Sequence, residues 1–110
     1  MPPGGGFKFE NIEFLARSDD THRFNLGIIT VPPHSEGPEP HIHKEEDDSF
    51  YILEGELELE HDGEKVAATK GTFVLVQPGV LHTFRNTTDE PARVLNVHSP
   101  AGFDKRVMED

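Results

Sequence analysis

Turn-forming residues divide most of this chain into short segments, and this spacing constrains the fold more than any other feature. From Phe24 onward, glycines, prolines and Asp-Gly or Pro-Gly pairs recur roughly every eight to twelve residues. The runs between them are rich in β-branched and aromatic residues and are too short for an ordinary helix. This spacing is typical of an all-β sandwich or barrel.

The apolar runs between these turns predict the strands. The clearest run is Glu-Leu-Glu-Leu-Glu at residues 56–60, whose strict alternation turns the leucines toward a core and the glutamates toward water. The Asp62-Gly63 pair that follows is a strong hairpin signal. A short helical turn is expected over residues 103–108. We expect strands over residues 8–16, 24–31, 49–53, 56–60, 65–68, 72–76, 80–85 and 92–98.

The length and charge of the chain limit its organisation and its partners. A chain of 110 residues suits one domain with one core. We expect that domain to cover residues 1–110, with the Pro/Gly-rich residues 1–6 flexible. The formal net charge is −11. Such an acidic chain is unsuited to the phosphate backbone of nucleic acids, which basic patches bind.

The remaining composition bears on location and on metal ligands. The start of the chain lacks the basic and apolar regions of a secretion signal, and no apolar run approaches the roughly 18 residues that cross a bilayer. We therefore expect a cytoplasmic protein that binds neither nucleic acid nor membrane. The sequence contains no cysteine, so a bound metal must rest mainly on nitrogen and oxygen ligands.

Three histidines in two distant segments are candidate metal ligands. His41 and His43 are two residues apart, so on a β-strand both imidazoles project from one face. Exposed or core-packed histidines would be the simpler interpretation of this pair alone. His82, however, lies in a second segment that a Pro-Gly turn opens. If the two segments are neighbouring strands, three imidazoles and an acidic group meet at one point, and such donors bind transition metals.

The residues around these histidines resemble the two motifs of the cupin superfamily. The first motif, at residues 37–55, combines an HxH pair with an acidic residue and a closing glycine: His41, His43, Asp48 and Gly55. The second, at residues 71–86, combines a glycine, a turn, a histidine and an asparagine: Gly71, Pro78, Gly79, His82 and Asn86. The resemblance is to small single-domain cupins, including quercetinase-like ones. It implies an all-β, single-domain jelly-roll β-barrel made of two packed antiparallel sheets.

The sequence departs from the family pattern at three positions. Gly37 lies closer to the HxH pair than the family's opening glycine does. Gln77 replaces the usual first proline of the second motif's turn. Asp48 stands where the family usually has glutamate, so the carboxylate is one methylene shorter.

The resemblance implies a metal site made of four residues, His41, His43, Asp48 and His82. It would hold one divalent transition metal, namely Fe, Mn, Ni, Co, Cu or Zn. Asp48 would be a direct ligand and catalytic base, or it would hydrogen-bond a ligand water from outside the coordination sphere. The neighbouring acidic residues, Glu45, Glu46 and Asp47, are expected to form a solvated loop.

Alternation along the strands suggests which residues surround this site. Phe50 and Ile52 share the parity of Asp48, and Phe84 shares that of His82, so we expect them to line a substrate pocket. His98, near the end of residues 92–98, is a further pocket candidate, although its side chain could equally face outward.

Three classes of function remain open at this stage. Quercetinase-like cupins open flavonol or diketone rings with dioxygen, so the resemblance implies a metal-dependent dioxygenase acting on a small oxygenated compound that is flavonol-, diol- or diketone-like. The alternatives are a metal-dependent isomerase, cyclase or lyase, and a non-catalytic barrel that binds a small molecule. We also expect a homodimer that pairs through edge strands and the N-terminal segment, because an exposed edge is otherwise a liability.

Overall fold

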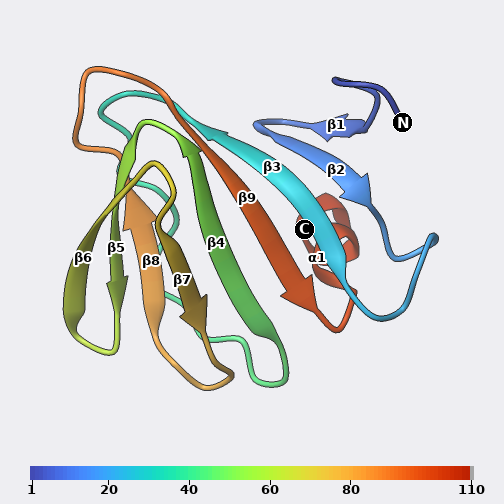
Figure 1. The fold of residues 1–110 in the computed structure, drawn as a ribbon. Coiled ribbons are helices and arrows are strands. Elements are labelled where there is room, and N and C mark those ends of the chain that lie inside the picture. Colours follow the sequence, from blue (N-terminus) through green and yellow to red (C-terminus); the bar gives the residue numbers. More distant parts are fainter. Residues whose placement is uncertain (110) are drawn as a thin grey trace.

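The computed structural model describes residues 1–109 and shows an all-β fold of two antiparallel sheets (Figure 1). The larger sheet has the strand order β1-β2-β3-β9-β4-β7, and the smaller has the order β6-β5-β8. The elements are β1 (Phe7–Phe9), β2 (Ile12–Ala16), β3 (Asn25–Val31), β4 (Asp47–Glu54), β5 (Glu56–His61), β6 (Glu64–Thr69), β7 (Phe73–Val76), β8 (His82–Arg85), β9 (Ala92–Ser99) and α1 (Phe103–Glu109). The predicted fold class is confirmed.

Alternation of side chains places the core between the two sheets. Every second residue is buried along β9 and along β4 from Asp48 to Ile52, and Leu57 and Leu59 of β5 face them from the smaller sheet. The outward residues of β5 are the three glutamates that the sequence assigned to solvent. Because each strand buries one face, its two-residue period alone decides which side chains enter the core.

Two hairpin turns contain residues with positive φ, and only the first has a clear sequence signal. Asp62 and Gly63 both have positive φ, of 50° and 80°, and they connect β5 to β6 as the predicted hairpin. Residues 8–16, expected to form one strand, instead form a second hairpin in which Phe9 pairs with Ile12. The chain reverses at Glu10, which has a φ of 53°. Without glycine or proline at this turn, the sequence carries no strong signal for it.

The loop at residues 32–40 runs beside β8 and so determines where the first histidine lies. Ser35 pairs with Asn86, and His41 pairs with His82, in isolated bridges at the two ends of β8. The Asn86 side chain donates to the carbonyl oxygens of Val31, at 3.2 Å, and Glu90, at 2.8 Å. Asn86 thus holds the turn after β8 against the end of β3.

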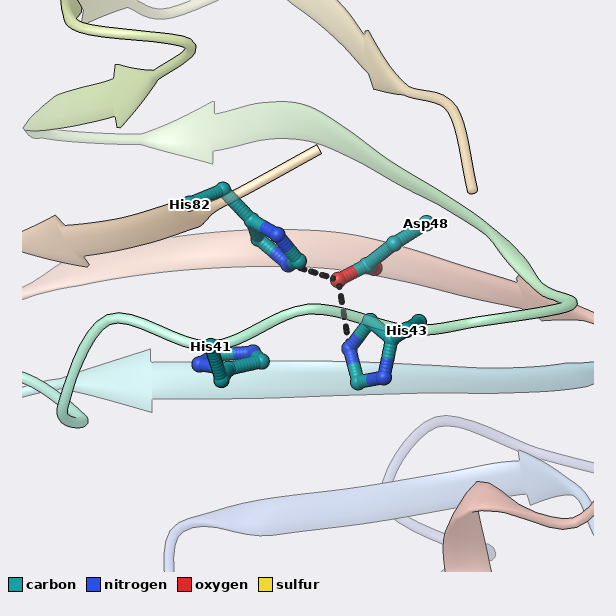
Figure 2. A group of neighbouring side chains, drawn as sticks. All are labelled: His41, His43, Asp48 and His82. Atoms are coloured by element: carbon teal, nitrogen blue, oxygen red, sulfur yellow. Dashed lines mark hydrogen bonds and ion pairs between the residues drawn. The ribbon is translucent and has the colours of Figure 1, made fainter. Parts of the chain in front are cut away.

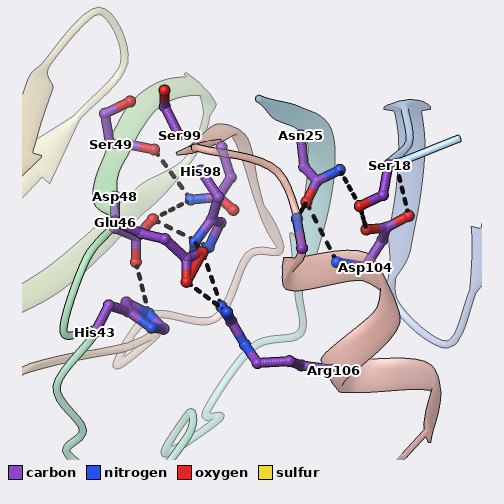
Figure 3. Close-up of polar contacts among 12 residues, drawn as sticks. Ser18, Asn25, His43, Glu46, Asp48, Ser49, His98, Ser99, Asp104 and Arg106 are labelled. Carbon is purple, nitrogen blue, oxygen red and sulfur yellow. Dashed lines mark hydrogen bonds and ion pairs between the residues drawn. The ribbon is translucent and has the colours of Figure 1, made fainter. Parts of the chain in front are cut away.

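Helix α1 is attached to the large sheet by buried polar contacts (Figure 3). Asp104 accepts hydrogen bonds from the Ser18 backbone N–H, at 3.0 Å, and from the Ser18 hydroxyl. The side-chain oxygen of Asn25 accepts one from the Gly102 backbone N–H at 2.9 Å. Within residues 1–109, no helix has the length and hydropathy of a transmembrane span.

Replacement of Asp104 by asparagine is expected to destabilise the fold in a pH-dependent way. Burial alone would raise the pKa of Asp104, but the Ser18 hydrogen bonds outweigh it and hold the pKa below its ordinary value. A depressed pKa stabilises the fold above the unfolded-state pKa of about 3.9, and this contribution is lost as the pH falls through the folded-state pKa. We expect a loss of about 1–3 kcal/mol at pH 7, measured by urea unfolding.

The same urea-unfolding measurements at decreasing pH test whether the ionised form of Asp104 stabilises the fold. The difference between wild type and Asp104→Asn should begin to shrink below about pH 4, where the carboxyl protonates in the unfolded state, and should be lost as the pH falls through the lower pKa of the folded state. Asp19→Asn is the matched control, because Asp19 is exposed and contacts only Lys105 among the ion pairs of the described residues. A difference that stays constant with pH would argue against an ionised Asp104 as the anchor.

Candidate metal centre

Four side chains from three parts of the chain converge at one end of the space between the sheets (Figure 2). His41 and His43 lie in the segment before β4, Asp48 on β4 and His82 at the start of β8. Each offers one ligand atom, and these atoms all lie within 4.8 Å of one another. The structure thus brings together all four residues that the family resemblance implied as ligands.

His41 and His43 reach the cluster from an irregular segment of backbone and not from a regular strand. His41 takes part in one bridge only, and β4 begins after His43, at Asp47. The HxH pair therefore does not lie on a regular strand, which was the condition under which alternation would place both imidazoles on one face. Prolines on either side of Glu39 interrupt strand pairing, since proline has no N–H to donate. The His41 and His82 backbones exchange hydrogen bonds of 3.0 and 2.9 Å, and Gly79 N–H donates to the His43 carbonyl at 2.8 Å.

Hydrogen bonds to backbone carbonyls decide which ring nitrogens of two histidines face the cluster. Nδ1 of His41 lies 2.8 Å from the Glu39 carbonyl oxygen, and Nδ1 of His82 lies 3.0 Å from that of Val80. A carbonyl only accepts, so each Nδ1 carries a proton and each Nε2 faces the cluster. Nε2 of His41 is available as a ligand, whereas Nε2 of His82 donates to Asp48 here and becomes a ligand when a metal ion takes the place of its proton. Burial lowers the pKa of His41 below its ordinary value, which favours the neutral form that a metal requires.

Asp48 is a buried, oriented carboxylate at the centre of the cluster. Its Oδ2 lies 2.9 Å from His82 Nε2 and 3.5 Å from His43 Nε2, while Oδ1 accepts a 2.8 Å hydrogen bond from the Asn96 amide. Burial would raise the pKa of Asp48, but the imidazoles and Asn96 outweigh it and lower the pKa well below its ordinary range. Likewise, burial would lower the pKa of His82, yet its hydrogen bond to Asp48 raises it.

The donor set fits a divalent transition metal. Nε2 of His43 is buried and has no hydrogen-bond partner. An unpartnered buried nitrogen is costly, and a cation is one group that would use its lone pair. Three imidazoles and one carboxylate are ligands that suit Fe, Mn, Ni, Co, Cu and Zn. These residues could therefore hold a metal ion. The structural observation that agrees with this role is that buried His43 Nε2 makes no hydrogen bond and has only a 3.5 Å contact with Asp48.

A second ring of contacts connects this cluster to α1 (Figure 3). The two ring nitrogens of His98 lie 3.3 Å from Glu46 and 3.3 Å from Asp48. Arg106 of α1 pairs with Glu46 at 2.5 and 2.8 Å, and Phe103 stacks on the His98 ring at a centroid distance of 3.9 Å. Burial lowers the pKa of His98 to about 4, so its imidazole is neutral at pH 7.

Glu46 corrects one sequence-based expectation. It was assigned with Glu45 and Asp47 to a solvated acidic loop, and those two are exposed. Glu46 is only 7% exposed. Burial would raise its pKa, but the hydrogen bond and charge of Arg106 lower it. This partner lies 60 residues away in sequence, so no local pattern could identify it.

The cluster opens onto a cavity of about 390 Å³, a size that suits a small ligand. Phe50, Phe84 and His98 line it, as expected. Ile52 does not: it is fully buried in the core, two residues further along β4, and its expected pocket position is corrected. Asn96 and Phe103 also line the cavity but were not predicted. Asn96 shares the parity of His98, so strand alternation could have indicated it.

The chemical character of the cavity wall is mainly apolar. Its apolar side chains come from both sheets and from α1: Ile12, Ile29, Val31, Phe50, Phe84, Phe103 and Val107. Among the described residues that line it, none is lysine or arginine. The wall therefore offers aromatic and aliphatic contact but no lysine or arginine to neutralise an anionic ligand.

Comparison with known proteins yields relatives in sequence and in structure. An uncharacterized protein of Aquifex aeolicus is 37% identical over 62 residues, covering 56% of this chain and 50% of that protein. The polyketide synthase CurC of Streptomyces cyaneus is 31% identical over 75 residues, covering 68% and 48%. The chain thus spans about half the length of the curated relatives it matches.

The fold and the family are shown by two further findings. A Thermotoga maritima structure described as a predicted oxalate decarboxylase superposes with a TM-score of 0.76 at 24% identity, covering 81% of this chain and 78% of that one. This likeness concerns the fold. A sequence model of the cupin domain matches residues 27–98, which include both motifs and all four clustered residues. The chain therefore belongs to the cupin superfamily.

Proposed function

We propose that this cupin is a metal-dependent dioxygenase that acts on a small, uncharged oxygenated compound of the flavonol, catechol or β-diketone class. The observation that carries the proposal is the position of a cluster of three histidines and a carboxylate at a cavity whose wall is aromatic and aliphatic and has no lysine or arginine. The cluster consists of His41, His43, Asp48 and His82. A divalent ion held by these four residues would supply Lewis-acid activation of a substrate oxygen and redox access to dioxygen.

Asp48 is the residue suited to move a proton in this site. Its depressed pKa keeps it ionised at neutral pH, and Asn96 holds Oδ1 so that Oδ2 faces the imidazoles. A substrate hydroxyl entering from the cavity would meet this oxygen, which would take its proton. The neutral His98 imidazole lies beside Oδ1 and helps to fix the carboxylate's orientation. Either role of Asp48, direct ligand or base outside the coordination sphere, is compatible with this geometry.

The cavity wall supports an uncharged, partly aromatic substrate. Phe50 and Phe84 pack edge to face, with centroids 5.8 Å apart, on the cavity side. Apolar walls orient flat rings and exclude water from the reacting atoms. The chain has a net charge of −11, and its cavity wall has no lysine or arginine to pair with oxalate or a phosphorylated sugar. The similarity to a polyketide synthase is in keeping with oxygenated carbon-chain chemistry.

A redox-neutral isomerase, cyclase or lyase is the second candidate. The observation that favours it is the same ionised carboxylate beside three imidazoles, which suits proton abstraction next to a polarised carbonyl without dioxygen.

Oxygen consumption tests the proposal. Protein loaded separately with Fe, Mn, Co or Ni is mixed with a panel of flavonols, catechols and β-diketones while dissolved oxygen is recorded. We expect uptake equimolar with substrate loss for at least one combination, and incorporation of both atoms of labelled dioxygen into product. Zinc-loaded protein is the redox-inert control. Turnover without oxygen uptake would assign the second candidate, and no uptake by any loaded form would reject the dioxygenase.

A further inference from the structure

The cavity beside the candidate metal centre has a second polar region, formed by the turn between β1 and β2. Glu10 and Asn11 of this turn line the cavity, as does Ser35. Outside the candidate metal centre and its neighbours Asn96 and His98, these three are the polar residues among the described residues that line it. The turn therefore offers a ligand polar contacts that the metal centre does not provide.

Strand register places this turn and the candidate metal centre at opposite ends of the larger sheet (Figure 1). The Asn11 carbonyl accepts a 2.9 Å hydrogen bond from the Thr30 N–H, and Thr30 pairs with Arg93 of β9. Asp48 pairs with His98, five residues further along β9. Five residues of a strand span about 17 Å. A ligand that fills the cavity therefore meets the two polar regions with different ends.

The Glu10 carboxylate is the polar group that is free to bind a ligand at this end. The Asn11 side-chain amide donates to the Thr30 carbonyl at 3.1 Å, and the Ser35 hydroxyl accepts from the Gly37 N–H at 3.3 Å. Within residues 1–109, the Glu10 carboxylate has no hydrogen-bond or ion-pair partner. An ionised carboxylate only accepts hydrogen bonds. The ligand group that suits this end of the cavity is therefore a hydrogen-bond donor.

The backbone holds Glu10 at the mouth of the cavity in a conformation that side-chain-bearing residues rarely adopt. Glu10 is exposed and has a φ of 53°, in the left-handed region where glycine is the usual residue. Phe9 and Ile12 pair on either side of the turn, and Ile12 also pairs with Ile29 of β3. The turn is therefore fixed to the sheet, and strain of this kind is common at ligand-contacting positions.

We propose that Glu10 determines substrate specificity by accepting a hydrogen bond from a hydroxyl group at the end of the substrate remote from the metal. This inference rests on the proposed function and narrows its substrate class. A compound that reaches both polar regions carries chelating oxygens at one end and a hydroxylated ring at the other, as a polyhydroxylated flavonol does. A single-ring catechol or a short β-diketone does not span both regions. The same carboxylate repels a substrate that carries an acidic group at this end.

Calorimetric titration of zinc-loaded protein with three flavonols tests the proposal. At the end remote from the chelating oxygens, the first flavonol has a plain phenyl ring, the second a catechol and the third a benzoate. We expect wild type to bind the catechol form at least about 10-fold more tightly than the phenyl form, and Glu10→Ala to lose this preference. Glu10→Gln should bind the benzoate form more tightly than wild type does, because the like charge is removed.

Glu36→Ala is the matched control for the loss of a carboxylate. Glu36 is exposed and lies between Ser35 and Gly37, which line the cavity, but it does not line the cavity itself. This variant should keep the wild-type preference for the catechol form. Stoichiometric zinc in each variant shows that the protein is folded and that the metal centre is intact.

The zinc form separates this inference from the proposed reaction, because zinc is redox-inert. Binding that depends on Glu10, without oxygen uptake by any other metal form, would support the role of Glu10 and reject the dioxygenase. Equal affinity of wild type for the phenyl and catechol forms would overturn the role of Glu10, as would an unchanged preference in Glu10→Ala, and oxygen uptake would then still support the dioxygenase. Failure of all three flavonols to bind would overturn the role of Glu10 together with the flavonol class.

Discussion

Replacing His82 with alanine is expected to abolish stoichiometric metal binding while preserving the fold. The His82 ring lies 4.4 Å from that of His41 and 5.1 Å from that of His43, centroid to centroid, and its Nε2 contacts Asp48. Loss of a ligand should exceed the 10–100-fold effect that is typical of residues around the ligands, so we expect affinity to fall more than about 100-fold. Equilibrium dialysis with zinc or cobalt, followed by elemental analysis, measures this.

Two features of the structure make this variant interpretable. The bridge between residues 41 and 82 uses backbone atoms only, so the substitution leaves that pairing available. His22→Ala is the matched control, because His22 is an exposed histidine in a loop outside the cluster. Unchanged metal content in His82→Ala, with its circular dichroism unaltered, would mean that the metal binds elsewhere.

Gly37→Ala is expected to cause the largest loss of stability among single-methyl changes in this chain. Gly37 has a φ of +70°, and a Cβ built there would lie 1.8 Å from the carbonyl oxygen of Phe84. The loop would have to move away from β8, so the added methyl would combine left-handed strain with a backbone clash. We expect a loss of more than about 3 kcal/mol, measured by urea unfolding. Metal affinity should fall as well, because this loop leads directly to His41.

The variant Gly63→Ala separates the effect of left-handed backbone strain from the effect of the backbone clash. Gly63 has a φ of +80°, but nothing lies within 4 Å of its added Cβ. This variant should lose only the strain of a left-handed residue, about 1–2 kcal/mol, with its metal binding unaffected. Equal losses in the two variants would show that loop 32–40 does not depend on close approach to β8.

The fold and the cluster were accessible from the sequence because their signals are local. Strict alternation at residues 56–60 identifies a half-buried strand, and Asp62-Gly63 identifies its hairpin. The ligand set followed from two motifs whose order and spacing resemble those of cupins. In each case a few neighbouring residues carry the information.

The residues that sequence reasoning missed depend on long-range contacts. Glu46 is buried because Arg106 reaches it from the C-terminal helix. Phe103 lines the cavity from the same helix and stacks on His98. The convergence of His41 and His43 comes from pairing with β8 and not from a strand of their own. None of these contacts produces a periodic pattern in the amino-acid sequence. Asn96 is the exception, since it shares the parity of His98 and strand alternation could have indicated it.

X-ray absorption spectroscopy of zinc-loaded protein tests the central claim most directly. Three imidazoles from two separate stretches of chain should surround each ion, so we expect multiple-scattering features of three imidazoles, with Zn–N distances of about 2.0–2.1 Å. An oxygen ligand in addition would be consistent with Asp48 or water. Coordination by oxygen alone, or by a single imidazole, would contradict the assignment and place the ion on the acidic surface.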